Sequence, residues 1–465
     1  MSHALNVTVG QEAGIRPERA IPPGDGGVPA PVRSGPISIR SRGAPPPPRL
    51  DRNADRWITA SGLAVAGGFV ALAVGAVALP EGVRLGAWLP LHLALAGAAS
   101  IAIGSAMPFF SAALAAAPPA PAALRIAVLG LLATGALGVA SRALAPGGPL
   151  VVPGGVAYLA GMALLAPTTF RPLLRSFGPR RPVVELAYAV AIADVLVGAG
   201  LAVLFVAGWP PVVAGWAAAK PAHAWLNLGG FVSLVIAGTL VHLLPTVVGG
   251  RIIPRPSGWV AVAGLVAGAP AVASGLLFRV DVLAGAGAAL AVAGALGLVV
   301  HAVEVVRARG RWTGDHGWHR IAIGTLLAAI AWFAVAVALA GGRVLGAGAS
   351  SRAWDLSEAG VPFAVGWVLQ ATVGAASHIL PSIGPGGPVR HAAQRRVLGR
   401  LATARIVGLN AGTALLALGM AGVGESIAVG GGSLAGFLAV SGALLAGGAL
   451  LFALVLAIAA ALARE

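Results

Sequence analysis

The chain has 465 residues, of which 58% are hydrophobic and only 10% are charged. A soluble domain carries roughly 25% charged residues, so the sequence has too little polar surface for a water-soluble globular protein. It contains no cysteine, which excludes disulfides, thiolate metal sites, iron–sulfur clusters and cysteine nucleophiles. The net charge is +16, but the basic residues lie in the N-terminal tail and in alternate loops, a pattern typical of membrane topology rather than of nucleic-acid binding.

Residues 1–56 are rich in proline, glycine and arginine. This segment lacks the apolar core of a cleaved signal peptide, and it has too few apolar residues to bury on folding. We therefore expect a disordered cytoplasmic tail over residues 1–56, followed over residues 57–465 by a polytopic helical membrane domain.

Twelve apolar runs follow the tail, and each meets the requirement of about 20 residues for crossing a bilayer. Only Arg279 and Asp281 separate the seventh run from the eighth, which predicts a tight turn between them. The sequence therefore predicts an all-α integral membrane protein with about 12 transmembrane helices. The approximate limits of the runs are 57–79, 86–114, 122–145, 150–170, 184–208, 221–248, 257–278, 280–306, 319–340, 360–383, 401–423 and 433–462.

The distribution of basic residues predicts the orientation. If the tail is cytoplasmic, 25 of the 31 basic residues lie on the cytoplasmic side, and six lie on the other side: Arg84, Arg142, Lys220, Arg279, Arg343 and Arg352. Because positively charged loops stay in the cytoplasm and the number of spans is even, both termini are expected there. We expect a multi-pass protein of a bacterial plasma membrane, with the lipid bilayer as a partner.

Part of the sixth run recurs in the tenth at a constant offset of 136 residues. Residues 238–247 align with residues 374–383, and each stretch has a histidine three residues before a proline, at His242 and His378. An offset of four helices predicts three arcs of four, with the second, sixth and tenth spans in equivalent places. Chance similarity between glycine- and alanine-rich helices is the alternative.

Two histidines lie near the non-cytoplasmic face, His92 in the second span and His223 at the start of the sixth. Polar groups inside a membrane are costly, so they are candidates for function. An imidazole offers a lone pair to iron, copper or zinc without adding net charge, and two at similar depth can ligate one haem from opposite sides. The alternative is two histidines that only form hydrogen bonds.

Three further residues are candidates for function: His242, His378 and Asp194. His242 lies 19 residues after His223, roughly 28 Å further along a helix, so it is expected near the cytoplasmic side with His378. This pair predicts a second metal site or contacts to haem propionates, with helix-end capping or packing as the alternative. Asp194 is the only acid well inside a span, and it is either a proton relay or an interhelical hydrogen-bonding group.

The remaining polar residues give weaker signals. His301 and Glu304 share a helix face, but two ligands alone are a weak indication of a metal site. His316 and His319 flank a charged loop and are expected to face solvent. The sequence contains neither a phosphate-binding loop nor a zinc-protease motif.

Two stretches resemble a known family, the subunit I superfamily of the haem-copper oxidases. Residues 91–97, running on to a pair of phenylalanines, resemble that family's second helix, whose histidine ligates low-spin haem. Residues 223–232 resemble its His-x-His helix. Twelve spans, cytoplasmic termini and a four-helix period agree with this resemblance, which implies a haem protein with His92 and His223 as axial ligands.

The sequence also departs from the family's pattern. Trp225 stands where the second histidine of the His-x-His pair would be, so only His223 carries over, and the motif lies in the sixth span rather than the tenth. The seventh span has no histidine, and Ala359 and Val361 stand where histidines are expected at the start of the tenth. Because the copper-ligand histidines are missing, we do not expect a complete oxygen or nitric oxide reductase.

The leading hypothesis is a divergent haem-binding, oxidase-subunit-I-like membrane protein. It would act in electron transfer or in gas or metal sensing, together with a redox partner protein. The alternatives are a cofactor-free transporter or metal-handling permease on the same scaffold, and a structural subunit that docks a redox partner. No nucleic-acid partner is expected, and no catalytic residue is assigned.

Overall fold

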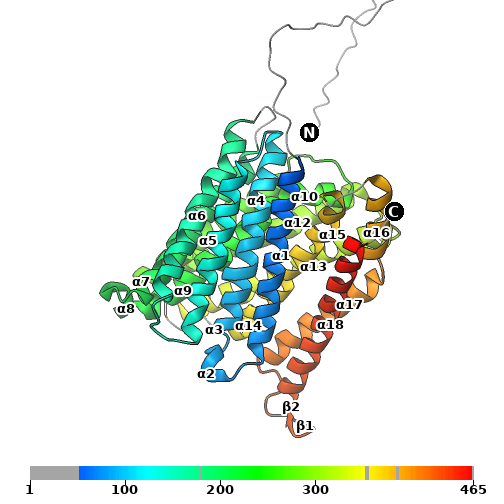
Figure 1. Cartoon of the computed structure of the whole chain (residues 1–465). Helices are drawn as coiled ribbons and strands as arrows, with labels where there is room; N and C mark the ends of the chain where they lie inside the picture. Colours follow the sequence, from blue (N-terminus) through cyan, green and yellow to red (C-terminus); the bar gives the residue numbers. More distant parts are fainter. Residues whose placement is uncertain (1–51, 177–180, 351–355, 384–386, 463–465) are drawn as a thin grey trace, which may run out of the picture. The chain divides into compact units, whose positions relative to one another are not determined.

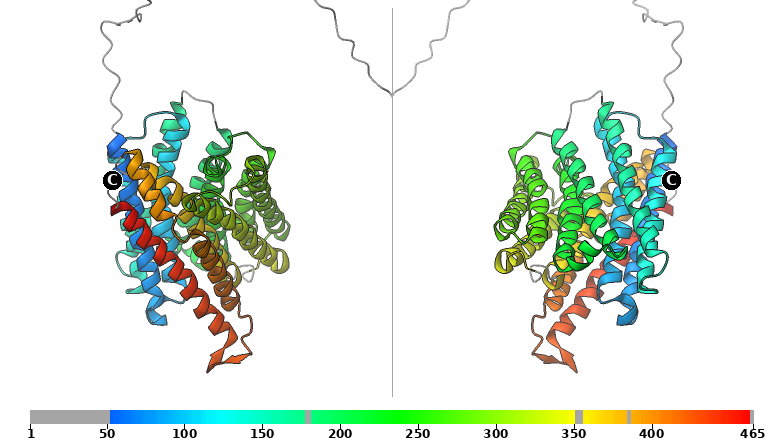
Figure 2. Two further views of the ribbon diagram at one scale, coloured as in Figure 1. Left: turned by 90° about the vertical axis from the view of Figure 1, so that its right-hand side faces the viewer. Right: turned by 90° about the vertical axis from the view of Figure 1, so that its left-hand side faces the viewer.

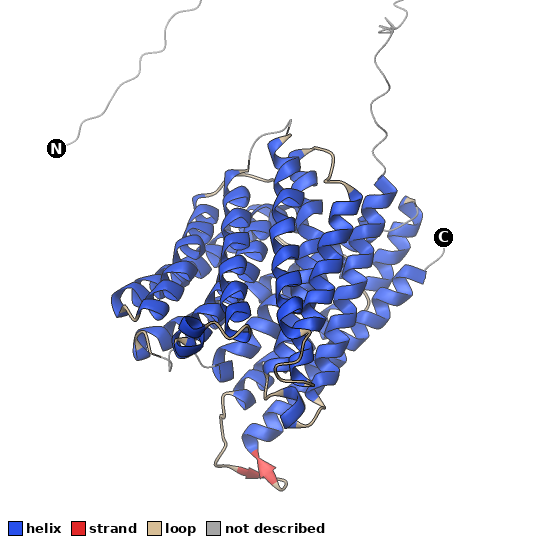
Figure 3. Cartoon of the chain, turned by 60° about the vertical axis from the view of Figure 1, so that its left-hand side comes forward, coloured by secondary structure: helices blue, strands red, loops and turns tan. Residues whose placement is uncertain are grey.

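The computed structural model describes residues 52–176, 181–350, 356–383 and 387–462. These residues belong to one compact unit, Leu50–Glu465, and nearly all of them are helical (Figure 3). Twelve helical segments are long and apolar enough to cross a membrane, so the predicted all-α integral membrane protein is confirmed. The predicted tail lies outside the described residues except for its last five, where α1 begins at Arg52.

The first four spans are α1 (Arg52–Val77), the continuous segment α3 (Trp88–His92), η1 (Leu93–Ala99) and α4 (Ser100–Ala115), then α5 (Ala122–Ala140) and α6 (Val151–Leu174). Spans five to eight are α7 (Pro182–Val206), the segment α9 (Trp216–Trp225), η3 (Leu226–Val232) and α10 (Ser233–Val248), then α11 (Pro256–Phe278) and α12 (Asp281–Arg309). The last four are α13 (Gly317–Ala347), the segment α14 (Leu356–Val361), η5 (Pro362–Leu369) and α15 (Gln370–Ile383), then α17 (Ala402–Met420) and α18 (Leu434–Leu462).

Short elements join the spans: α2 (Glu81–Arg84), the 3₁₀-helix η2 (Ser141–Ala143), α8 (Pro210–Ala214), α16 (Pro388–Leu398) and a hairpin of β1 (Ala428–Val429) and β2 (Gly432–Ser433). The two strands are antiparallel, with Ala428 opposite Ser433. In Figure 1, α1 begins and α18 ends toward the same end of the bundle. We call this the arginine-rich end, because its loops and helix termini carry Arg175, Arg181, Arg251, Arg255, Arg309, Arg320, Arg395 and Arg396.

Two boundaries test the sequence prediction. Arg279 adopts the left-handed conformation with φ 55° and ends α11, and α12 begins at Asp281, so the predicted tight turn is confirmed. The sixth span, in contrast, begins at Trp216 rather than at residue 221. Lys220 and Pro221 suggested a helix end, but both lie inside α9, because neighbouring helices let membrane helices tolerate proline.

The most extensive helix contacts recur with a period of four spans. They join the third span to the fourth, the seventh to the eighth and the eleventh to the twelfth, and the last of these pairs, α17 and α18, is inclined against the other helices (Figure 2). Glycine permits the close approach: a Cβ at Gly264 in α11 would lie 2.6 Å from the Cα of Gly294 in α12. Small residues are favoured at such interfaces because lipid supplies no hydrophobic drive between helices.

A π-helix interrupts the second, sixth and tenth spans, as η1, η3 and η5. The π-helices begin at Leu226 in the sixth span and at Pro362 in the tenth, which reproduces the offset of 136 residues. In each span the following helix contains a proline, namely Pro108, Pro245 and Pro381. The three spans are therefore equivalent in local structure, which supports the predicted four-helix repeat.

The helices that follow the three π-helices surround an apolar cavity of about 130 Å³. Its lining comes from α4, α10 and α15, from the end of each preceding π-helix, and from α1. The hydroxyls of two lining residues, Thr239 and Thr372, donate to carbonyl oxygens one turn earlier in the same helix at 2.7 Å. The lining therefore offers few unsatisfied polar groups to a water molecule.

Candidate functional site

The rings of His92 and His223 lie next to each other. His92 is the last residue of α3, directly before η1, and His223 lies in α9, three residues before η3. Their ring centroids are 6.5 Å apart and their planes differ by 11°. Both residues are of intermediate exposure. The structure thus brings together the two histidines that the sequence places at similar depth, near the end of the bundle opposite the arginine-rich end.

Hydrogen bonds fix the tautomer of both rings. His92 Nδ1 lies 2.7 Å from the carbonyl oxygen of Trp88, and His223 Nδ1 lies 2.7 Å from that of Gly198 on α7. Because a carbonyl oxygen only accepts, each Nδ1 carries the proton and each Nε2 keeps its lone pair. Asn227 Nδ2 also lies 3.2 Å from His223 Nδ1, but it donates instead to the His223 carbonyl oxygen at 2.6 Å.

Aromatic rings flank the two histidines. Trp88 stacks on the His92 ring with centroids 4.2 Å apart. The ring centroid of Trp216 lies 6.4 Å from that of His223. Trp216 also stacks on Phe205, with centroids 4.0 Å apart. The guanidinium of Arg142 lies over the Phe205 ring at 6.0 Å. The site therefore combines apolar walls with a cation at its edge.

Each imidazole keeps a lone pair on Nε2, so the donor set is one that can ligate a metal. The ring centroids are 6.5 Å apart, close to the about 6 Å that two metal–nitrogen bonds of about 2 Å would give if both Nε2 atoms faced one ion. A structural zinc ion takes four protein ligands, and no group of three or more His, Cys, Asp or Glu side chains able to hold an ion occurs in the described part of the chain. Haem iron would need only these two imidazoles from the protein, because the porphyrin supplies the remaining ligands.

Asp194 lies in the middle of α7 and is only 5% exposed. Its Oδ2 has no hydrogen-bond partner, and the carboxyl group packs against Gly230 in η3, where a Cβ would collide with it. The alternative that the sequence offered, a hydrogen bond to a neighbouring helix, is not found among the described residues. A role as proton relay stays a prediction, supported by the cost of burying an unsatisfied carboxyl group.

His242 and His378 have different neighbours. His242 interacts electrostatically with Arg181, directly before α7, whereas His378 stacks on Trp318 of α13 with centroids 6.1 Å apart. The Nδ1 atom of His378 has no hydrogen-bond partner. No ring contact or hydrogen bond that involves described residues joins the two histidines, and a shared metal site there stays a prediction.

His301 and Glu304 each bind other groups. His301 is 1% exposed, and its Nε2 donates to the carbonyl oxygen of Val241 on α10 at 3.1 Å. Ser257 on α11 donates to Glu304 at 2.6 Å and lies 3.4 Å from His301 Nδ1. These contacts hold α10, α11 and α12 together, so both side chains have a structural role here.

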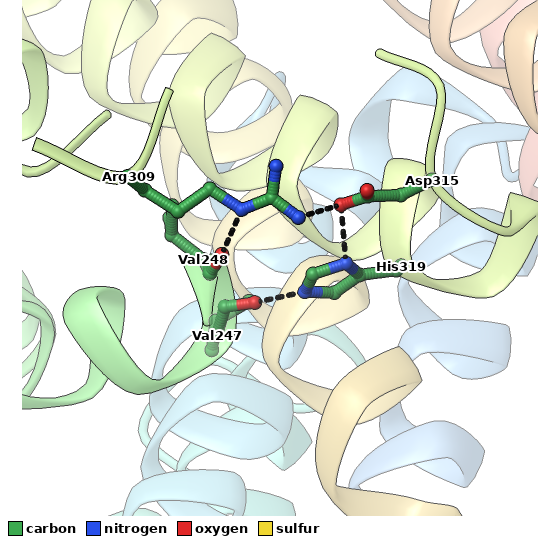
Figure 4. A network of polar contacts seen from close by, with 5 residues as sticks. All are labelled: Val247, Val248, Arg309, Asp315 and His319. Atoms are coloured by element: carbon green, nitrogen blue, oxygen red, sulfur yellow. Dashed lines mark hydrogen bonds and ion pairs between the residues drawn. The ribbon is translucent and has the colours of Figure 1, made fainter. Parts of the chain in front are cut away.

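The prediction that His319 faces solvent is wrong. Its side chain is 15% exposed, and its ring lies between the carboxylate of Asp315 and the carbonyl oxygen of Val247, while Arg309 binds the same carboxylate at 2.6 Å (Figure 4). Partial burial opposes ionisation of Asp315, but the hydrogen bonds from Arg309 and His319 outweigh it and hold the pKa of this carboxyl group below its usual value. The misleading signal was the run of charged residues, which normally marks a solvated loop.

No protein-family model matches the chain, and no curated protein matches it.

Proposed function

We propose that the protein is a haem-binding membrane protein in which His92 and His223 are the axial ligands. The observation that supports this proposal is the pair of nearly parallel imidazoles, 6.5 Å apart, each with Nδ1 bonded to a carbonyl oxygen. Metal-ligating histidines almost always donate their second ring N–H in this way, which fixes the ring and makes the free nitrogen a better ligand.

The protein's own residues would orient and enclose the group. The carbonyl oxygens of Trp88 and Gly198 accept hydrogen bonds from the two rings and so orient them. The side chain of Asn227 donates to the carbonyl oxygen of His223. The tryptophan side chains limit the access of water. When bound between two imidazoles, haem iron carries single electrons, and its potential depends on its axial ligands, on hydrogen bonds to them and on burial. We therefore favour electron transfer with a redox partner protein, in the plasma membrane of a bacterium.

The relation to haem-copper oxidase subunit I is part of the same proposal. It rests on the motifs around His92 and His223 and on the recurrence of π-helices in the second, sixth and tenth spans. The missing copper ligands argue against reduction of oxygen or nitric oxide. Gas sensing would be the variant of this function in which the haem held by His92 and His223 also bound a small molecule.

The apolar cavity favours a second candidate, a transporter or permease without a cofactor. Four spans line the cavity, so a conformational change among them could move an apolar molecule. This candidate requires no ligand at His92 or His223, and the same experiment therefore separates it from haem binding.

The experiment is an absorption spectrum of the purified protein, oxidised and reduced with dithionite, after expression with ample haem. We expect a Soret band that shifts on reduction, and we expect His92→Ala and His223→Ala each to lose or shift it. His378→Ala is the matched control and should leave the spectrum unchanged. Carbon monoxide should alter the reduced spectrum only if the protein is a gas sensor. Absence of a Soret band in the unmodified protein would reject haem binding and favour the transporter.

A further inference from the structure

The imidazole of His319 has a hydrogen-bond acceptor at each nitrogen. Its Nδ1 lies 2.7 Å from Asp315 Oδ2, and its Nε2 lies 2.5 Å from the carbonyl oxygen of Val247 (Figure 4). An ionised carboxylate and a carbonyl group accept hydrogen bonds but cannot donate them. Both ring nitrogens must therefore carry a proton for both contacts to be hydrogen bonds. A ring that is protonated at both nitrogens is an imidazolium.

The carbonyl oxygen of Val247, which accepts from His319 Nε2, lies in the last turn of α10. The last carbonyl groups of an α-helix have no partner within the helix. At the end of α10, the N–H groups of Gly249 and Gly250 bind the carbonyl oxygens of Thr246 and Pro245, at 3.1 and 2.8 Å. The next two carbonyl groups receive side chains instead: His319 binds that of Val247 and Arg309 Nε binds that of the following residue at 3.0 Å. Positive charge at a helix C-terminus is also favoured by the helix dipole.

The charged groups around His319 come from four helices and from the loop before α13. Asp315, in the loop before α13, favours the protonated ring, and it also accepts from Arg309 at the end of α12. The opposing groups are His378 on α15, which interacts electrostatically with His319, and Arg395 on α16, whose guanidinium lies 4.9 Å from the ring of Trp318. On α13 itself, Arg320 follows directly in the sequence. One acid, Asp315, is thus in direct contact with His319, and none of the surrounding cations that the structure describes hydrogen-bonds to it.

We propose that His319 is a proton-controlled clasp, which ties the arginine-rich end of α10 to α13 when its imidazole is protonated and releases it when the proton leaves. A neutral imidazole has one N–H. If that N–H stays with the carboxylate of Asp315, the lone pair of Nε2 faces the lone pairs of the Val247 carbonyl oxygen, and the contact becomes repulsive. Arg309 keeps its own bond to α10 in both states. The released movement is therefore a separation of α10 from α13, while α10 stays attached to α12.

The protonation of His319 determines at which pH the contact with α10 forms. The contact between His319 and Val247 is a hydrogen bond only while Nε2 carries a proton, so the contact is lost when the ring is deprotonated. α10 continues without a break from η3 and α9, which carry His223 at the opposite end. The contacts of His319 involve neither His92 nor His223, so the clasp does not depend on haem binding at that end.

The absence of cysteine allows a clean test on the full-length protein. Arg251 and Gly314 are both exposed, and they lie on the α10 side and the α13 side of the clasp. Cysteines introduced at both positions and spin-labelled would report the distance across it by pulsed electron resonance, at about pH 5.5 and about pH 8.5, on either side of the histidine range. We expect one short, narrow distance distribution at the lower pH and a longer, broader one at the higher pH.

Two variants and one direct measurement make the outcome decisive. His319→Gln should show a distance distribution that no longer depends on pH, whereas His378→Gln, which changes the neighbouring histidine, should keep the dependence. Nitrogen NMR of histidine-labelled, otherwise unmodified protein should show an imidazolium signal at about pH 5.5 that His319→Gln removes. A neutral His319 at that pH, or a pH dependence that survives His319→Gln, would overturn the proposal.

Discussion

His301 donates the hydrogen bond that α10 lacks at Pro245. In an α-helix the N–H of residue 245 would bind the carbonyl oxygen of Val241, four residues earlier, but proline has no N–H. The Nε2 of His301, on α12, donates to that oxygen at 3.1 Å. The histidine is 1% exposed, so its burial is explained by a proline on another helix.

The first prediction concerns this pair. His301→Ala should lower the free energy of unfolding by about 1–3 kcal/mol, the cost of leaving a buried carbonyl group without a partner. Pro245→Ala restores a backbone N–H at the right place, so His301→Ala should cost less in that background. The thermal unfolding midpoints of the four proteins of this double-mutant cycle measure the coupling, which we expect to be about 1 kcal/mol. Strict additivity would show that the bond to Val241 contributes nothing.

The second prediction concerns Asp194, whose Oδ2 is buried without a partner. Asp194→Ala should raise the unfolding midpoint, because it removes an unsatisfied group that costs on the order of 1 kcal/mol. Asp281→Ala is the matched control: Asp281 Oδ1 accepts from the backbone N–H of Ala349 at 2.7 Å, so its removal should lower the midpoint. A lower midpoint for Asp194→Ala would mean that the carboxyl group stabilises the fold, and it would weaken the case for a functional residue there.

The spans were predictable because a bilayer imposes long apolar runs, and a turn such as that at Arg279 must interrupt them. The pairing of His92 and His223 was also predictable, since both lie at similar depth in spans related by the repeat. The π-helices were not predicted, because neither hydrophobicity nor helix propensity distinguishes them from α-helix. Their recurrence before Ser100 and Ser233 emerges only from the backbone hydrogen bonds.

His319 shows why the hydrogen-bond partners of some polar residues could not be predicted from the sequence. Its neighbours Asp315 and Arg320 are charged, and charge normally indicates a solvated loop. The decisive partner is the carbonyl group of Val247, 72 residues away, and backbone acceptors leave no trace in the side-chain pattern. One signal was available: the Gly249–Gly250 pair marks a helix end, whose orphan carbonyl groups require donors.

The third prediction tests the close approach of α11 and α12. Gly264→Ala should lower the free energy of unfolding by about 1–3 kcal/mol, the usual cost of overpacking, because the new Cβ would lie 2.6 Å from the Cα of Gly294. Gly285→Ala, in the partner helix α12, is the control: the nearest neighbour of its new Cβ would be a Leu345 methyl group at 3.5 Å, an ordinary contact. Equal midpoints for the two variants would show that this interface adjusts freely.

The last prediction concerns the pH dependence at Asp315. Its pKa is held below the ordinary 3.8, by hydrogen bonds from Arg309 and His319 that outweigh the effect of burial. For a carboxyl group whose pKa is lower in the folded than in the unfolded protein, the stabilisation is complete above the unfolded value and is lost as the pH falls through the folded value. Asp315→Asn should therefore lower the unfolding midpoint at pH 6, and the difference from the unmodified protein should shrink below about pH 4. A difference that is the same at pH 6 and at about pH 3 would mean that the ionised form of Asp315 receives no stabilisation from these two cations.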